Sequence, residues 1–149
     1  NNSNFKKNTD LLLYLAARSE NIEYLKKYYK KKIILLDRFT DSTIAYQHFG
    51  MGVNLEILNK VNNHLLKSFK VDFTFLNTVS EKNMKKRLKE RKKLNRYDKF
   101  EKKFYHRVQK GFIKISKNKK NYKIINSNYP IEKNKKDIID KIEALIKWI

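Results

Sequence analysis

A short apolar run that ends in an acid–arginine pair constrains the fold of this chain more than any other feature. Residues 33–36 read Ile-Ile-Leu-Leu, and Asp37 and Arg38 follow directly. Such a continuous apolar run is typical of a strand buried on both faces of a parallel sheet. Ligands of open α/β sheets bind beyond the carboxyl ends of the strands, so we expect Asp37 and Arg38 to face a metal ion and a phosphate. The simpler interpretation is that Asp37 caps the following helix.

Helical and extended patterns alternate along the chain. Helices are expected over about residues 10–29, 42–49, 55–69, 80–91, 100–115 and 138–148. Strands are expected at residues 33–36, 71–76 and 122–125. Thr9 or Asp10 is suited to cap the first helix and Ser80 the fourth. This alternation predicts an α/β fold with a parallel sheet, and so few strands suggest that N-terminal strands of the sheet are absent from the given chain.

The composition fits a single folded domain. A chain of 149 residues is the length of one ordinary domain. The absence of cysteine excludes disulfides and thiolate chemistry, and it fits a reducing compartment. No secretory signal begins the chain, and no apolar run approaches the roughly 18 residues of a membrane-spanning helix. We therefore expect a cytoplasmic protein with no membrane partner.

The charge alone does not identify a partner. A net charge of +21 suggests a polyanion such as nucleic acid. The lysines, however, are spread over almost every segment, and a basic surface attracts a nucleotide as well as a polymer. A basic nucleic-acid-binding module without catalysis is therefore one alternative, and it predicts a steep salt dependence with no nucleotide selectivity.

Several separated blocks of the sequence form a recognisable series: LLLYLAAR at 11–18, LLDRFTDSTIAYQ at 35–47, Gly50 with Gly52, DFTF at 72–75, RLKERKKLNR at 87–96 and FYHRVQKGF at 104–112. In this order the blocks resemble the thymidylate kinases, the nucleoside monophosphate kinases that act on dTMP. The resemblance implies a three-layer P-loop nucleoside monophosphate kinase fold with a parallel sheet. It implies one domain over residues 1–149, the C-terminal portion of the family's domain, with a lid at residues 91–100.

The same resemblance implies an activity and its partners. The family phosphorylates dTMP to dTDP with ATP and Mg2+, in dTTP biosynthesis. A helix-packed homodimer is implied as well, with no specific nucleic-acid partner. A related nucleotide or nucleoside kinase with another base preference, such as one for deoxyuridylate, is a further alternative, because base preference depends on the shape of the pocket.

The resemblance also assigns roles to residues of the acceptor site. Tyr14 matches the aromatic position that stacks on the pyrimidine, and Arg18 matches the arginine that reads a base carbonyl; a spacing of four places both on one helix face. Arg38 matches the arginine that holds the acceptor phosphate, and its planar fork suits two phosphate oxygens. Asp37 would orient Mg2+, directly or through water. Without the resemblance, Tyr14 would be read as core and Arg18 as a surface charge.

Further roles concern the sugar, the donor and the lid. Thr43, Tyr46 and Gln47 match positions that contact the thymine edge and crowd the sugar, although an ordinary polar helix face is the alternative. Arg91 and Arg96 match lid arginines that bind the donor, and with Arg38 they form the expected catalytic set. Positive charge and positioning carry most of the catalysis in phosphoryl transfer. Arg107 matches another arginine of the family's motif, and it is expected to brace the lid helix.

One motif of the family is missing. The given chain contains no phosphate-cradling loop of the pattern GxxxxGK[ST], whose backbone amides, lysine and hydroxyl hold the donor and its Mg2+. In the family this loop precedes the helix that is expected here near Thr9. We therefore expect that these 149 residues alone do not transfer phosphate, and that the given sequence omits an N-terminal unit.

Overall fold

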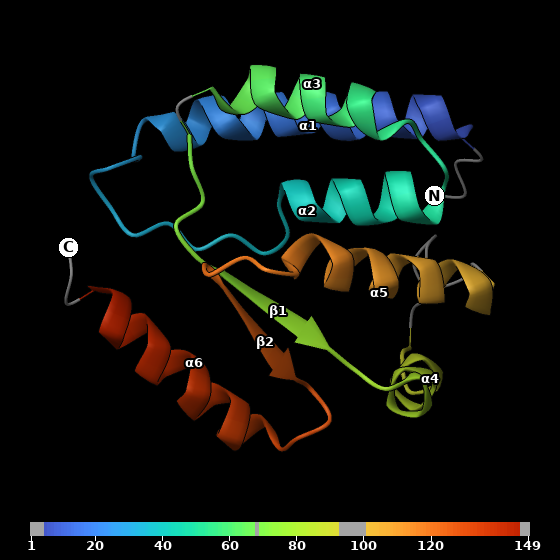
Figure 1. Ribbon diagram of the computed structural model, residues 1–149, viewed down its shortest axis with the longest axis vertical. Helices are drawn as coiled ribbons and strands as arrows, with labels where there is room; N and C mark the ends of the chain where they lie inside the picture. Colours follow the sequence, from blue (N-terminus) through green and yellow to red (C-terminus); the bar gives the residue numbers. More distant parts are fainter. Residues whose placement is uncertain (1–4, 68, 93–100, 147–149) are drawn as a thin grey trace. The chain divides into compact units, whose positions relative to one another are not determined.

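The chain builds a helical unit and a mixed unit, and passes from one to the other more than once. A computed structural model describes residues 5–67, 69–92 and 101–146 (Figure 1). Of these residues, 5–67, 69–71 and 101–117 form the helical unit, and 72–92 and 118–146 form the mixed unit. Segments far apart in the sequence therefore build each unit.

The helical unit contains every residue expected at the acceptor site. Its elements are α1 (Lys7–Lys26), α2 (Thr40–Thr43), the π-helix η1 (Ile44–Gly50), α3 (Leu55–Leu66) and α5 (Lys102–Ser116). Helix α1 lies beside α3, and η1, which continues α2, lies beside α5 (Figure 1). A π-helix is rare and is frequently found at functional sites, so η1 is a notable element of this unit.

An apolar cluster joins α1 to α3. Leu11 and Leu15, four residues apart on α1, are buried against Leu58 and Val53. This spacing places both leucines on one helix face, which explains the observed packing. Helix α3 begins where the Asn54 side chain accepts hydrogen bonds from the backbone N–H groups of its first turn, at 2.7 and 3.3 Å.

Two glycines allow η1 to approach α5 closely. A Cβ atom on Gly50 would lie 2.6 Å from the ring of Phe104, and one on Gly111 would lie 2.6 Å from the ring of Phe49. Phe49 and Phe104 thus fill the space that a larger residue would occupy on the opposite helix. The ring of Tyr46 makes edge-to-face contacts with two rings of α5. Its centroid lies 6.0 Å from that of Phe104 and 6.3 Å from that of Phe112.

The mixed unit is built on two parallel strands. Strand β1 (Thr74–Thr78) pairs with β2 (Tyr122–Asn126) in the register Thr74 to Tyr122, and α4 (Glu81–Lys89) and α6 (Ile131–Ile146) complete the unit. Leu76 and Ile125 are buried. Ser80 caps α4 by accepting a hydrogen bond from the backbone N–H of Asn83 at 3.3 Å, so the expected cap is confirmed.

The expected strand at residues 33–36 is wrong. These residues have no regular secondary structure, and Ile33 and Leu35 are 60% and 79% exposed. A strand needs a neighbouring strand to bind its backbone N–H and C=O groups. In the part of the chain that the structure describes, β1 pairs only with β2, so the apolar run has no partner there. The apolar pattern alone therefore did not identify a strand.

Other boundaries also differ from expectation. Helix α1 begins at Lys7, so the expected cap at Thr9 or Asp10 is wrong, and Asp10 is buried within the first turn. Strand β1 starts at Thr74 instead of residue 71. Helix α6 starts directly after Pro130, well before residue 138, because the fixed φ of proline favours a helix start. Its first turns are rich in charged residues, so the sequence shows no apolar period there. No helix in the described residues is long and apolar enough to cross a bilayer.

We predict that Gly111→Ala destabilises the protein. At an exposed position inside a helix, alanine is normally more stabilising than glycine, by about 1 kcal/mol of unfolding free energy. The new Cβ would lie 2.8 Å from the Cβ of Phe49, which is fixed to the backbone and cannot turn away. Overpacking of this kind costs about 1–3 kcal/mol. Urea unfolding measures the effect. Lys110→Ala, at the exposed neighbouring position, is the control and should be nearly neutral; stabilisation by Gly111→Ala would contradict the close approach.

Candidate functional site

Arg38 has an unusual backbone conformation at the expected phosphate position. Its φ is +65°, a left-handed value that non-glycine residues rarely adopt. The other described non-glycine residues with positive φ, which are Lys30, Lys67 and Asn118, follow helices, where such a residue commonly ends the helix. Arg38 instead follows a segment without regular secondary structure, so helix termination does not explain its conformation. Strained residues of this kind concentrate at functional sites.

The guanidinium of Arg38 lies over an aromatic ring. Its central carbon is 5.2 Å from the centroid of the Tyr46 ring, a cation–π geometry. The structure thus brings together two residues that the sequence placed in the acceptor site. The planar fork of an arginine can also bind two oxygens of a phosphate, so Arg38 is chemically suited to the role expected of it.

Arg18 is held in the same manner on α1. Its guanidinium carbon lies 4.6 Å from the centroid of the Phe39 ring, and burial lowers the pKa of the Arg18 side chain. Its Nε is buried and has no hydrogen-bond partner in the part of the chain that the structure describes. An unsatisfied buried donor is unfavourable, so a carbonyl or phosphate oxygen that accepted this hydrogen bond would be bound favourably.

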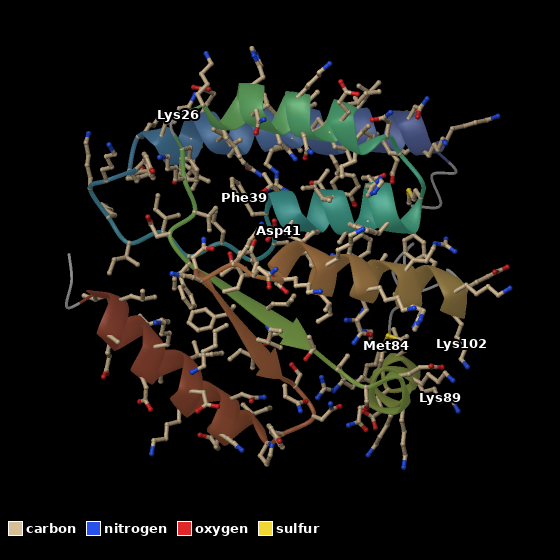
Figure 2. The ribbon with its side chains drawn as sticks, viewed as in Figure 1. Lys26, Phe39, Asp41, Met84, Lys89 and Lys102 are labelled. Carbon is tan, nitrogen blue, oxygen red and sulfur yellow. The ribbon has the colours of Figure 1, made fainter. Side chains whose placement is uncertain are left out.

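Phe39 was not among the residues expected at the site. It lies at the start of α2, toward α1 (Figure 2), and its ring centroid is 5.8 Å from that of Phe69. Phe69 in turn stacks on Tyr29 at 4.5 Å, and the hydroxyl of Tyr29 accepts a hydrogen bond from the backbone N–H of Lys70. This aromatic cluster fixes the ring that carries Arg18. An aromatic residue directly after the Asp37–Arg38 pair was the only available signal in the sequence.

Gln47 connects η1 to α1. Its side chain is buried, with 1% of its surface exposed, and its Nε2 lies 3.5 Å from the Oδ2 of buried Asp10. The Oδ2 of Asp10 accepts this hydrogen bond, so the amide of Gln47 presents its nitrogen to Asp10. Its Oε1 is buried and has no partner among the described residues. The sequence analysis assigned Asp10 to a helix cap and so missed this role.

The remaining expected residues have different environments. Tyr14 is 42% exposed on α1, whereas Thr43 is buried in α2. Asp37 is exposed. Arg91 belongs to the mixed unit and is exposed, and Arg96 lies outside the described residues. The residues expected at the acceptor site therefore all belong to the helical unit, and their roles, like those of Arg91 and Arg96, stay predictions.

Asp37 is the expected Mg2+ ligand, and its surroundings show which kind of Mg2+ site it could form. Among residues 5–67, 69–92 and 101–146, no group of three or more His, Asp or Glu side chains could hold a metal ion. Mg2+ in phosphoryl-transfer sites usually binds one or two carboxylates, several waters and the phosphates of the substrate. A single exposed carboxylate such as Asp37 fits that mode of binding, and it does not fit a site made only of protein ligands.

A family model and individual relatives of this chain all indicate the same family. The family model for thymidylate kinase matches residues 1–138. The thymidylate kinase of Trichodesmium erythraeum (strain IMS101) is 34% identical over 143 residues, which cover 94% of this chain and 64% of the relative. The thymidylate kinase of Thermosipho africanus (strain TCF52B) is 32% identical over 149 residues, which cover 99% of this chain and 72% of the relative. The chain thus spans only part of the length of these relatives.

A solved structure is also similar. The crystal structure of thymidylate kinase from Ehrlichia chaffeensis superimposes with a TM-score of 0.72 at 26% sequence identity, covering 95% of this chain and 67% of that chain. The expected α/β fold class is confirmed by this similarity and by the parallel pairing of β1 with β2. The expected resemblance to the family is confirmed as well.

We predict that Asp10→Ala lowers the free energy of unfolding by about 1–3 kcal/mol, because the buried Nε2 of Gln47 would lose its acceptor. The single variant Gln47→Leu completes the cycle. The double variant Asp10→Ala/Gln47→Leu should lose less unfolding free energy than the sum of the losses in the two single variants, because it leaves no unsatisfied amide. Urea unfolding of the four proteins in this cycle measures the coupling. Glu20→Ala, an exposed carboxylate on the same helix, is the control. Additive effects would contradict the pairing.

Proposed function

Since this chain belongs to the thymidylate kinase family, we propose that the protein transfers the γ-phosphoryl group of ATP to dTMP and releases dTDP for dTTP biosynthesis. The observation that best supports the proposal is the pair of arginines, Arg18 and Arg38, whose guanidinium groups each lie over an aromatic ring within one helical unit. One is suited to a base carbonyl and the other to a phosphate. A cytoplasmic homodimer, as expected from the sequence, is part of the proposal.

In the proposed acceptor complex, Arg38 binds the monophosphate. The ring of Tyr46 supports one face of the guanidinium, which reduces the freedom that the side chain would lose on binding. The planar edge can then donate two parallel hydrogen bonds to phosphate oxygens. The resemblance assigns Tyr46 to the position that crowds the sugar, so it would contribute to the choice between deoxyribose and ribose.

The base would be bound by residues of α1, α2 and η1. Tyr14, whose ring is partly exposed, would stack on the pyrimidine, and Arg18 would donate from its unsatisfied Nε to a base carbonyl. Thr43 and Gln47 would line the remaining edge of the base. A site that hydrogen-bonds the edge of its substrate rejects analogues lacking those groups, because its buried polar atoms would then be unpaired.

The donor side of the site rests on the sequence. Arg91 and Arg96 would bind the phosphates of ATP and stabilise the charge that spreads over the oxygens of the transferred group. Asp37 would hold Mg2+ or one of its waters; when bound, the ion neutralises phosphate charge. The net charge of +21 raises the local concentration of both anionic substrates.

The first test is an ATP-dependent phosphorylation assay of the whole protein with dTMP, with dUMP and dCMP as competing acceptors. We expect formation of dTDP that requires Mg2+ and prefers dTMP. The matched measurement is binding of single-stranded DNA over a range of salt. No phosphoryl transfer, together with tight DNA binding that weakens steeply with salt, would favour the nucleic-acid-binding alternative. A preference for another monophosphate would favour the related-kinase alternative.

We predict that Arg18→Ala raises the KM for dTMP by about tenfold or more and leaves the KM for ATP nearly unchanged, because a hydrogen bond to a charged donor contributes about 1.5–3 kcal/mol. Steady-state kinetics on the whole protein measures both constants. Lys7→Ala, an exposed cation on the same helix, is the control for the loss of charge. An unchanged KM for dTMP would remove Arg18 from the base site.

A further inference from the structure

Arg107 of α5 binds the last two carbonyl groups of η1. Its Nη2 donates to the carbonyl oxygen of Gly50 at 2.7 Å, and its Nε donates to the carbonyl oxygens of Phe49 at 3.2 Å and Gly50 at 3.3 Å. The proposed activity does not use this residue, and the sequence analysis expected only that it braces the lid helix. Its partners belong to the helix that carries Tyr46.

Arg107 completes the hydrogen bonding at the C-terminal end of η1. The carbonyl of Tyr46 accepts from the N–H of Met51 at 3.0 Å, as a π-helical turn requires. The next two carbonyls accept from the N–H groups of Val53 at 2.8 Å and Gly52 at 2.9 Å. The carbonyls of residues 49 and 50 come last, and the guanidinium supplies their donors. Helix ends leave such carbonyl groups without intrahelical partners, and a cation there is also favourable to the helix dipole.

The same helix that carries Arg107 also fixes the side chain of Tyr46. Phe104 and Phe112 of α5 contact the Tyr46 ring edge to face. Gly50 lets the end of η1 approach Phe104 closely. The backbone end of η1 and the ring of Tyr46 are therefore both set by contacts from one helix.

We propose that Arg107 is a positioning residue of the acceptor site. By holding the last carbonyls of η1, it sets the position of the Tyr46 ring, and through that ring it sets the Arg38 guanidinium that lies 5.2 Å from the ring centroid. Arg107 itself does not touch the substrate. The inference rests on the proposed function, because it assigns Arg38 and Tyr46 to the binding of a nucleoside monophosphate.

The geometry requires an arginine. A planar guanidinium donates in two directions and can bind both carbonyls at once, whereas the ammonium of lysine is a compact charge on a flexible stem. Arg107→Lys therefore keeps the favourable charge at the end of η1 but loses the simultaneous contact. Arg107→Gln loses both.

The test compares Arg107→Gln, Arg107→Lys and the control Lys110→Gln, an exposed cation on the same helix, in the whole protein. We expect Arg107→Gln to raise the KM for dTMP about tenfold with the KM for ATP unchanged, and Arg107→Lys to raise the KM for dTMP about threefold. A lower preference for dTMP over its ribose analogue should accompany both changes. Thermal unfolding of each variant separates these effects from loss of fold.

The outcomes distinguish the inference from the proposed function. A wild-type protein that does not phosphorylate dTMP would refute the proposed function itself. An active wild type whose Arg107→Gln variant loses only thermal stability, with both KM values and the sugar preference unchanged, would overturn the positioning role. If Arg107→Gln does not fold, Arg107→Lys decides the question, because an unchanged KM for dTMP in that folded variant would also overturn it.

Discussion

The close contact between η1 and α5 determines where the candidate acceptor site can form. Gly50 and Gly111 remove the two Cβ atoms that would keep the helices apart, and Phe49 and Phe104 occupy the space. This close approach places the ring of Tyr46 against α5, and Arg38 lies on the face of that ring. A change of a few tenths of an ångström at the glycines would therefore be transmitted to Arg38, because packed protein interiors are nearly incompressible.

A second contact fixes the other side of the same segment. Gln47 reaches Asp10 on α1, and Arg18 on α1 reaches Phe39 at the start of α2. Residues 39–50 are thus held from α1 as well as from α5. Binding residues supported in this way lose little conformational freedom when a ligand binds, and this preorganisation increases affinity. It also explains how a left-handed conformation at Arg38 can persist, since the surrounding structure must compensate its cost.

Local sequence patterns predicted the helices and the parallel pair better than they predicted the environment of the site. The Ser80 cap depends only on residues within one helical turn, which the sequence shows directly. The apolar run at 33–36 failed because burial of a strand depends on another segment that pairs with it. Asp10 was missed for the same reason: its partner is 37 residues away. The family resemblance identified site positions, but only the structure showed which aromatic rings support the arginines.

The charge of the chain and the charge of the site act at different ranges. A net charge of +21 attracts any anion to the surface, and it does so without selecting among phosphates. Selection requires donors in a fixed geometry. Arg18 and Arg38 are the candidates for such donors, because the guanidinium of each lies over an aromatic ring that limits its motion. For Arg18, burial also penalises the charged form, so an oxygen that pairs with it relieves a cost that an exposed lysine never has.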